Sequence, residues 1–145
     1  MSITFQAIDA HRVRRKVIGG ETVEFPTRLD LGDAHFLNLA NENARLLLLA
    51  LGLAGDGTLW GTCTLPKMRR HIMVARATGT AARYTRAPEL RYGAPVHRGD
   101  GVIELRPVRV CSGGLDEADL TSRIDRLAAL TAAADAHGAT HIDWG

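Results

Sequence analysis

The sequence predicts a single α+β domain that combines a small mixed or antiparallel sheet with about three helices. Strand-like alternation of apolar and polar residues marks the N-terminal part of the chain, whereas helical periodicity occurs in three later segments. The expected order is strands, two helices, a strand, a helix and a final strand, which differs from the regular β–α alternation of parallel sheets. A chain of 145 residues with 46% hydrophobic content matches one globular domain, so we expect residues 1–145 to fold together.

The first predicted strands surround a pair of glycines. Residues Ser2–Ile8 alternate apolar and polar side chains in the manner of a half-buried strand. Val13–Ile18 and Glu21–Phe25 flank Gly19-Gly20, and two glycines supply the positive φ angles that a two-residue hairpin turn needs. Pro26 has no backbone N–H to donate, so we expect it to end the second strand of this hairpin.

The stretch NLANENARLLLLALGL predicts the first helix, from about Glu42 to Leu51. Before it, His35–Leu39 is expected to form a short strand or an extended lead-in. Asn41 suits the N-cap, because its side-chain oxygen can accept a hydrogen bond from a free backbone N–H one turn later, and Gly52 suits a left-handed stop. Apart from Arg45 the helix is apolar on all sides, so we expect it at the centre of the core.

A glycine-rich loop is expected over residues 54–61, followed by a second helix over Pro66–Thr78. Proline is favoured in the first turn of a helix, and Gly79 is a suitable C-terminal stop. The predicted apolar stripe of this helix consists of Leu65, Met68, Ile72 and Ala75.

A further strand, a long helix and a short terminal strand complete the prediction. Val102–Val110 alternates as a strand, and Pro107 favours a position at the edge of the sheet. Asp116 is the expected N-cap of the third helix, and Gly138 is its expected stop. His141–Trp144 then forms the last strand. The buried face of the third helix is expected to hold Leu120, Ile124, Leu127, Thr131 and Ala134.

Two segments, FLNLANENARLLLLALGL and LTSRIDRLAALTAAADAHGATHIDWG, resemble a group of small bacterial proteins, mostly actinobacterial and some carried by phages. The shared features are an LN-x-x-N-x-NA-x-x-LL-x-LGL-like helix start and a closing helix followed by a strand that ends in Trp-Gly. The resemblance covers under a third of the chain. It implies that both segments belong to one domain. No activity is established for the group, so the resemblance assigns no catalytic residue.

Three asparagines at the start of the first helix form one candidate site. Asn38, Asn41 and Asn43 lie where free backbone N–H groups and the helix dipole favour an anion, so they are candidates to bind a phosphate or a nucleobase. The alternative is structural, with one asparagine capping the helix and the others fixing the incoming strand. The structural interpretation is favoured, because asparagine is a common capping residue.

A basic segment in the middle of the chain forms the second candidate site. Residues 61–98 carry eight basic residues against one acid, a net charge of +7, whereas residues 113–145 carry a net charge of −4. Such a surface would bind nucleic acid or an acidic protein. In the alternative interpretation, which is slightly favoured, the basic segment lies against the acidic C-terminal helix. The candidate binding residues in the second helix are Lys67, Arg69, Arg70 and Arg76.

Residues that carry metal or catalytic chemistry form no recognised pattern in this chain. Cys63 and Cys111 are not part of a CxxC pair, and no HExxH, GxSxG, GxGxxG or GxxxxGK[ST] spacing occurs. His141 and Asp143 alternate on the predicted terminal strand and would face the same side. Residues 1–10 lack the features of a signal peptide, and no apolar run is long enough to cross a bilayer. We therefore expect no metal, cofactor or membrane insertion, and a cytoplasmic location.

The preferred hypothesis is a non-enzymatic binding module, consistent with a phage or mobile-element origin, whose basic surface contacts an acidic protein or nucleic acid. The second hypothesis is a small enzyme or nucleotide-binding protein with a polar site around Asn38, Asn41 and Asn43.

Overall fold

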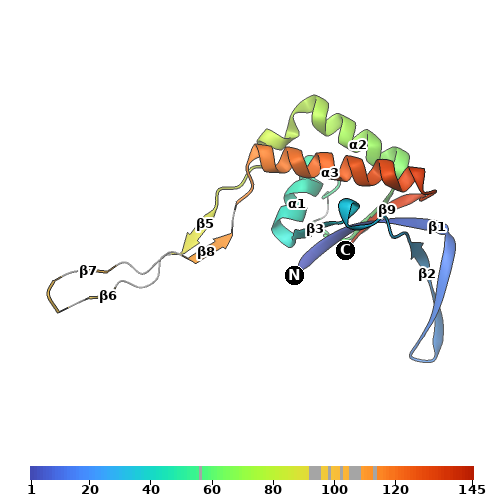
Figure 1. Ribbon diagram of the computed structural model, residues 1–145, viewed down its shortest axis with the longest axis horizontal. Helices are drawn as coiled ribbons and strands as arrows, with labels where there is room; N and C mark the ends of the chain where they lie inside the picture. The colour runs from blue at the N-terminus through green and yellow to red at the C-terminus, as the bar shows by residue number, and fades with distance from the viewer. Residues whose placement is uncertain (56, 92–95, 98, 102, 105–108, 113) are drawn as a thin grey trace.

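A computed structural model of the chain describes residues 1–55, 57–91, 96–97, 99–101, 103–104, 109–112 and 114–145, and its main feature is an antiparallel sheet covered on one face by three helices (Figure 1). This arrangement confirms the predicted α+β class. The strands of the sheet are β1 (Ser2–Ile18), β2 (Glu21–Arg28), β3 (Leu37–Ala40), β4 (Gly61–Thr64) and β9 (His141–Trp144). The helices are α1 (Asn41–Ala50), α2 (Leu65–Thr78) and α3 (Glu117–Ala136), with short 3-10 helices η1 (Asp33–His35) and η2 (Thr80–Arg83).

Strand β1 is the central strand of the sheet. On one side it pairs first with β3 and then with β2, and on the other side it pairs with β9, which in turn pairs with β4. Every pairing is antiparallel, so residues directly opposite each other share a face. The residues that the sheet turns toward the helices are Ile3, Phe5, Ala7, Leu37, Leu39, Cys63, Ile142 and Trp144.

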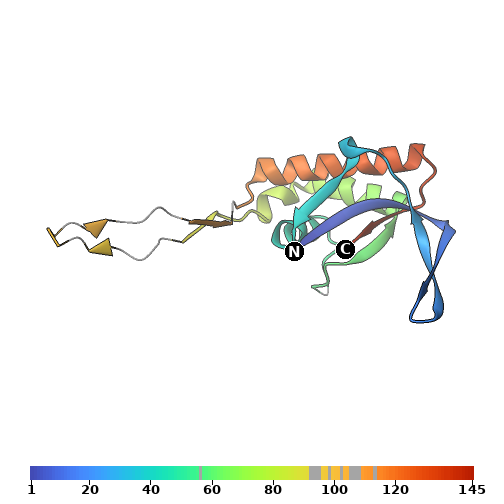
Figure 2. The same cartoon turned by 60° about the horizontal axis from the view of Figure 1, so that its bottom comes forward.

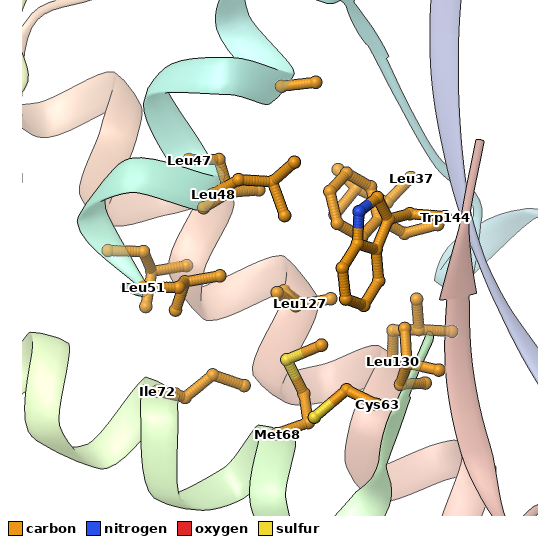
Figure 3. Packing of buried hydrophobic residues seen from close by; sticks show 14 of the residues in the cluster. Leu37, Leu47, Leu48, Leu51, Cys63, Met68, Ile72, Leu127, Leu130 and Trp144 are labelled. Carbon is orange, nitrogen blue, oxygen red and sulfur yellow. The ribbon is translucent and has the colours of Figure 1, made fainter. Parts of the chain in front are cut away.

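Helix α1 packs at the centre of the core, as its sequence predicts. Leu47 and Leu48 are fully buried and face the sheet beside Trp144 (Figure 3). The Trp144 ring stacks on Phe5 with a centroid distance of 6.2 Å, which joins β9 to β1. Met68 of α2 and the buried side chains of the long helix α3 pack in the same core as the leucines of α1.

The ends of α2 and α3 agree with the sequence prediction. Pro66 lies in the first turn of α2, and Gly79 follows its last residue with a φ of 60°. Asp116 caps α3, because its Oδ1 accepts a hydrogen bond of 2.7 Å from the backbone N–H of Asp119. Gly138, at a φ of 74°, ends α3 and leads into β9. The predicted apolar faces of both helices are buried, namely Leu65, Met68, Ile72 and Ala75 of α2 and Leu120, Ile124, Leu127, Thr131 and Ala134 of α3.

The predicted cap of α1 is wrong. The helix begins at Asn41 itself, Ala40 occupies the N-cap, and no side chain makes a capping hydrogen bond. The physical reason is the pairing of β3 with β1, which extends to the pair Ala40–Ser2 and keeps Ala40 as the last extended residue. The C-terminal stop is confirmed, because Gly52 has a φ of 69° and its N–H donates to the carbonyl of Leu49.

The predicted boundary at Pro26 is also wrong. The two expected N-terminal strands are one strand, β1, and β2 continues past Pro26 to Arg28. Pro26 lies opposite Val13, next to a bulge in which residues 10–12 of β1 have no partner on β2. Among the described strands, β2 pairs with β1 alone, and an edge strand tolerates a proline. Strand β4 was not predicted, because its four residues follow a glycine-rich loop without a break.

Two short antiparallel strand pairs form a ribbon outside the main sheet (Figures 1 and 2). Here β5 (Glu89–Arg91) pairs with β8 (Arg109–Ser112), and β6 (Val96–His97) pairs with β7 (Ile103–Glu104). A bridge between Arg86 and Leu115 joins this ribbon to the body. The predicted strand over residues 102–110 is found in part as β7 and the start of β8, whereas Val102 and residues 105–108, with Pro107, lie outside the described residues.

Candidate functional site

The basic residues of α2 divide into paired and unpaired groups. Arg69 forms an ion pair of 2.6 Å with Asp135, and Arg76 forms one of 2.5 Å with Asp125. Both acids belong to α3, which lies beside α2 (Figure 1). All four side chains are about half exposed, so each ion pair adds little to the free energy of unfolding. The pairs do neutralise the charges of the two arginines. Two of the four predicted binding residues on α2 thus have their charge balanced within the molecule.

Lys67 and Arg70 are the other two predicted residues on α2. Both are exposed, and neither forms an ion pair with any residue that the structure describes. They line a shallow surface concavity together with His71 and Val74. The His71 ring turns inward, with its Nδ1 2.8 Å from the carbonyl oxygen of Leu51. A small cationic surface therefore remains on α2.

The three asparagines of the other candidate site lie on two different elements. Asn38 of β3 faces away from the helices, and its Nδ2 donates to the Thr4 hydroxyl on the neighbouring strand at 3.0 Å. Asn41 is half-buried at the start of α1, and its Oδ1 is buried without a hydrogen-bond partner among the described residues. Asn43 is also half-buried in α1. Among these three asparagines, only Asn41 has a buried polar atom without a hydrogen-bond partner in the part of the chain that the structure describes.

The face of the sheet away from the helices is polar. Gln6 donates to the Asp143 carboxylate at 3.1 Å, and His141 lies on the same face, as the sequence predicts. The His141 Nδ1 is 2.8 Å from the Thr140 hydroxyl oxygen. Within the described ranges, no three His, Cys, Asp or Glu side chains come together as a metal site. The face thus holds a hydrogen-bonded pair and a histidine, without a recognisable catalytic arrangement among these residues.

Cys63 is a buried, free thiol on the helix side of the sheet. Burial raises the pKa of this thiol above its ordinary value of 9.0, and the nearby positive charge of Lys67 lowers it by a smaller amount. The thiol therefore stays protonated and weakly nucleophilic near neutral pH. Cys111, the other cysteine, has a side chain outside the described part of the molecule.

The outer part of β1 and β2 form a hairpin whose surface is exposed and carries many charged side chains. It projects from the body beyond Ile8 and His141, where the pairing between β1 and β9 stops (Figures 1 and 2). Every residue from Ala10 to Pro26 is exposed. The pairing is regular from Val13–Pro26 to Ile18–Glu21, across the turn at Gly19 and Gly20. Because opposite residues share a face and neighbours alternate, this register defines two faces of the ribbon.

One side of the hairpin carries an aromatic ring and cations, and we call it the Phe25 face. It consists of Arg14, Lys16, Ile18, Glu21, Val23 and Phe25. The exposed fractions of Phe25 and Ile18 are 41% and 51%, so both present apolar surface to solvent. Arg14 and Lys16 make no ion pair with the residues described here. Arg28, further along β2, likewise forms no ion pair with the described residues. It lines a concavity of about 530 Å³ whose other lining residues are Arg14, Arg15, Lys16, Ile18, Phe25 and Pro26.

The opposite side, which we call the Arg15 face, is electrostatically different. It consists of Val13, Arg15, Val17, Thr22, Glu24 and Pro26. The Nε of Arg15 donates to the Glu24 carboxylate directly opposite, at 2.8 Å. This pair neutralises the Arg15 face, whereas the Phe25 face keeps two cations on β1 and one acid, Glu21, beside the turn.

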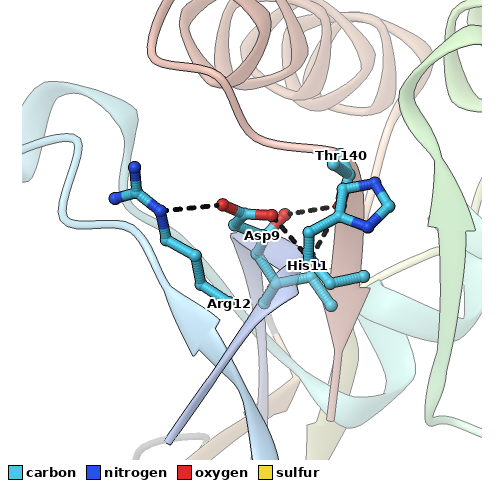
Figure 4. Close-up of polar contacts among 6 residues, drawn as sticks. Asp9, His11, Arg12 and Thr140 are labelled. Atoms are coloured by element: carbon cyan, nitrogen blue, oxygen red, sulfur yellow. Dashed lines mark hydrogen bonds and ion pairs between the residues drawn. The ribbon is translucent and has the colours of Figure 1, made fainter.

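A hydrogen-bonded bulge fixes the base of the hairpin (Figure 4). The Asp9 carboxylate accepts from the backbone N–H of His11 at 2.9 Å and lies 3.4 Å from the Nε of Arg12. The backbone N–H of Ala10 donates to the Thr140 hydroxyl at 2.8 Å, which ties the bulge to the segment before β9. The direction of the hairpin is therefore set by specific bonds, and the charge of Arg12 is balanced by Asp9.

The net charges of residues 61–98 and 113–145 do not indicate this hairpin, which lies outside both segments. The sequence VRRKVI of Val13–Ile18 does indicate it, because a strand with this sequence carries Arg14 and Lys16 on one face and Arg15 on the other. A strand with charge on both faces cannot bury either face in a core, so it must stand clear of the body.

Comparisons of the chain with protein-family models, curated protein sequences and solved structures gave no significant match. No helix in the described ranges is both long enough and apolar enough to span a bilayer.

Proposed function

We propose that this protein is a non-enzymatic nucleic-acid-binding module and that the Phe25 face of the β1–β2 hairpin is its contact surface. The observation that carries the proposal is the separation of charge on the hairpin. Arg14 and Lys16 form no ion pair with any residue that the structure describes, and they lie beside an exposed aromatic ring, whereas Arg15 is neutralised by Glu24 on the opposite face. A phage or mobile-element origin remains part of this proposal, on the basis of the two sequence segments described above.

The hairpin is a better contact surface than α2. Arg69 and Arg76 already have acidic partners on α3, so a nucleic acid would have to displace those carboxylates to use them. Arg14 and Lys16 need no such displacement. A phosphate backbone gains from each unpaired cation through release of its condensed counterions, which makes the binding strongly dependent on salt.

Nucleic acid fits this surface better than an acidic protein does. An acidic peptide would use the cations of the Phe25 face but gain little from the ring itself, whereas nucleic acid supplies both phosphates and flat aromatic bases. Protein surfaces that bind single-stranded nucleic acid usually combine cationic and aromatic side chains in one groove.

The test is a salt titration of oligonucleotide binding with matched charge variants. Arg14→Gln and Lys16→Gln should each weaken binding and each reduce the slope of log K against log salt by roughly 0.7–0.9. Arg15→Gln removes the same charge from the opposite face and should change the slope much less, because Arg15 is held by Glu24. Equal slope changes in all three variants would contradict the proposal, since they would indicate a response to net charge alone.

The surface on α2 provides the competing location for the same function. If Lys67→Gln with Arg70→Gln reduces the salt slope while the hairpin variants leave it unchanged, α2 is the contact surface and the hairpin is not. The hairpin proposal predicts the opposite pattern.

One observation favours the alternative of a nucleotide site at the start of α1. The buried Oδ1 of Asn41 lacks a hydrogen-bond partner among the described residues, and such an atom is stabilised by a donor from a ligand. An increase in melting temperature with a nucleotide that is lost in Asn41→Ala would support this alternative. The hairpin proposal predicts that mononucleotides leave the melting temperature unchanged.

A further inference from the structure

We infer that the ligand of the Phe25 face is a single-stranded nucleic acid, with a base stacked on Phe25 and the flanking phosphates against Arg14 and Lys16. This inference rests on the proposed function, because it names the class of nucleic acid that the same surface would take.

The register places the cations around the ring. Arg14 lies directly opposite Phe25, and Lys16 lies opposite Val23, which makes Lys16 the diagonal neighbour of Phe25 on the same face. Cβ atoms of directly opposite residues are about 4.5–5.5 Å apart, and diagonal neighbours are about 7–8 Å apart. Both cationic side chains are long enough to reach groups bound over the ring, and the Arg14 guanidinium can also interact with a base through its flat face.

The exposure of Phe25 has no structural explanation within the hairpin. Its side chain is 41% exposed and does not belong to the hydrophobic core. Ile18 and Val23, on the same face, are also exposed. Ile18 and Phe25, but not Val23, line a concavity of about 530 Å³, which is within the range of small-ligand sites. Its other lining residues are Arg14, Arg15, Lys16, Pro26 and Arg28. The surface is therefore both apolar enough to stack a base and large enough to hold one.

A duplex would make poor use of this face. In a duplex the bases are stacked on each other, and a protein reads their edges with hydrogen-bonding side chains in the grooves. The Phe25 face carries no Asn, Gln, Ser or Thr, and three of its six residues are apolar. Arg14 and Lys16 could contact the phosphates and guanine edges of a duplex, but Phe25 would find no open base face there. A single strand offers the flat faces of its bases to the ring.

An anionic membrane is the other ligand that combines negative charge with apolar surface. The end of the hairpin argues against it, because the turn consists of two glycines and the residue that follows is Glu21. A ribbon that inserts into a bilayer by its tip would place this carboxylate against the anionic headgroups. The cations and the ring instead lie along the length of the ribbon, which suits a strand that runs beside it.

The experiment compares a fluorescent oligo(dT) with a duplex of the same length and mixed sequence, at low salt. Phe25→Ala should weaken binding of the single strand by roughly 5- to 150-fold, the range given by the loss of one base–aromatic stack. Its effect on the duplex should be less than twofold, because the phosphate contacts remain. The matched control is Val17→Ala, which removes an exposed apolar side chain from the Arg15 face and should change neither affinity.

A second variant protects the test against a change in folding. Phe25→Trp keeps an aromatic surface and should retain the affinity for the single strand, and the fluorescence of the new indole should be quenched when a base stacks on it. Melting followed by circular dichroism should be unchanged in all three variants, because these side chains lie outside the core.

Each outcome distinguishes the inference from the proposed function. If single strand and duplex bind equally and Phe25→Ala behaves as Val17→Ala, the inference is wrong while the proposed function stands. If neither nucleic acid binds at low salt, both are wrong. If vesicles of anionic phospholipid bind in a Phe25-dependent way and oligo(dT) does not, the ligand is a membrane surface and the inference is overturned.

Discussion

Gly61 of β4 is a position where a single added methyl group should strain the packing of the core. A Cβ at Gly61 would lie 2.6 Å from Cζ2 and 3.0 Å from Cε2 of the Trp144 ring, well inside the optimal separation of about 3.5–4.0 Å between carbon atoms. The ring cannot move freely, because it is 6% exposed and stacked on Phe5. Gly61→Ala should therefore strain the contact between β4 and β9.

The expected magnitude combines two opposing contributions. Overpacking a well-packed core costs about 1–3 kcal/mol. Gly61 does not have a positive φ, so alanine fits the backbone and also reduces the entropy of the unfolded chain, which stabilises by about 0.4–1 kcal/mol. The net result should be a loss of roughly 0–2.6 kcal/mol in the free energy of unfolding.

Urea unfolding followed by far-UV circular dichroism measures this loss without relying on the fluorescence of Trp144. A double-mutant cycle supplies the control, since Trp144→Phe removes the ring atoms that the new methyl group would meet. In that background Gly61→Ala should cost at least 1 kcal/mol less, an interaction of the size expected for residues in contact (about 0.5–3 kcal/mol). Additive effects of the two substitutions would refute the proposed steric cause.

Three further predictions concern the helix start, the inter-helix ion pair and the thiol. Asn41→Ala should change the free energy of unfolding by less than about 0.5 kcal/mol, whereas Asp116→Ala should lower it by about 0.5–2 kcal/mol, because only Asp116 makes a capping hydrogen bond; equal losses in urea unfolding would contradict the assignment. Arg76→Glu should destabilise by no more than about 1 kcal/mol, and adding Asp125→Arg should recover that loss, because the pair is half exposed; thermal melting of the single and double variants checks this. The free energy of unfolding should fall as pH rises above 9.0, because the unfolded chain loses the Cys63 proton first and the folded chain keeps it, and Cys63→Ala should reduce this fall in urea unfolding at pH 8 to 10.

The helices could be predicted because their signals are local. The stop at Gly79 and the cap at Asp116 depend on residues within one turn of the helix, so the sequence alone contains them. The error at Asn41 has a non-local cause, since the pairing of β3 with β1 decides where the extended chain ends. That pairing cannot be predicted from the residues of α1 themselves.

The sheet was less predictable for the same reason. The bulge at residues 10–12 interrupts the alternation, so one long strand has the pattern of two. Proline usually ends a strand because it has no backbone N–H to donate, but Pro26 lies on an edge strand, where that N–H is not needed. The four residues of β4 are too few for an alternating pattern, and Gly61 is required by Trp144, which lies far along the chain.

The candidate site depended most on three-dimensional information. The basic segment 61–98 was visible in the sequence, but its pairing through Arg69 and Arg76 with α3 required the fold. The cations of the hairpin lie outside residues 61–98, so the net charge of that basic segment does not include them. The separation of Arg14 from Arg15 onto opposite faces follows from the register, which the Gly19–Gly20 turn sets and which the sequence did contain.

The most direct measurement of the central claim is the set of backbone amide chemical-shift changes when a short single-stranded oligonucleotide is added to the ¹⁵N-labelled full chain. We expect the largest changes in residues 14–25 of the hairpin and at Arg28, with small changes in α2 and at Asn41. The result that would contradict it is binding in which the largest changes occur around Lys67 and Arg70, or at the start of α1, while the amides of the hairpin do not shift.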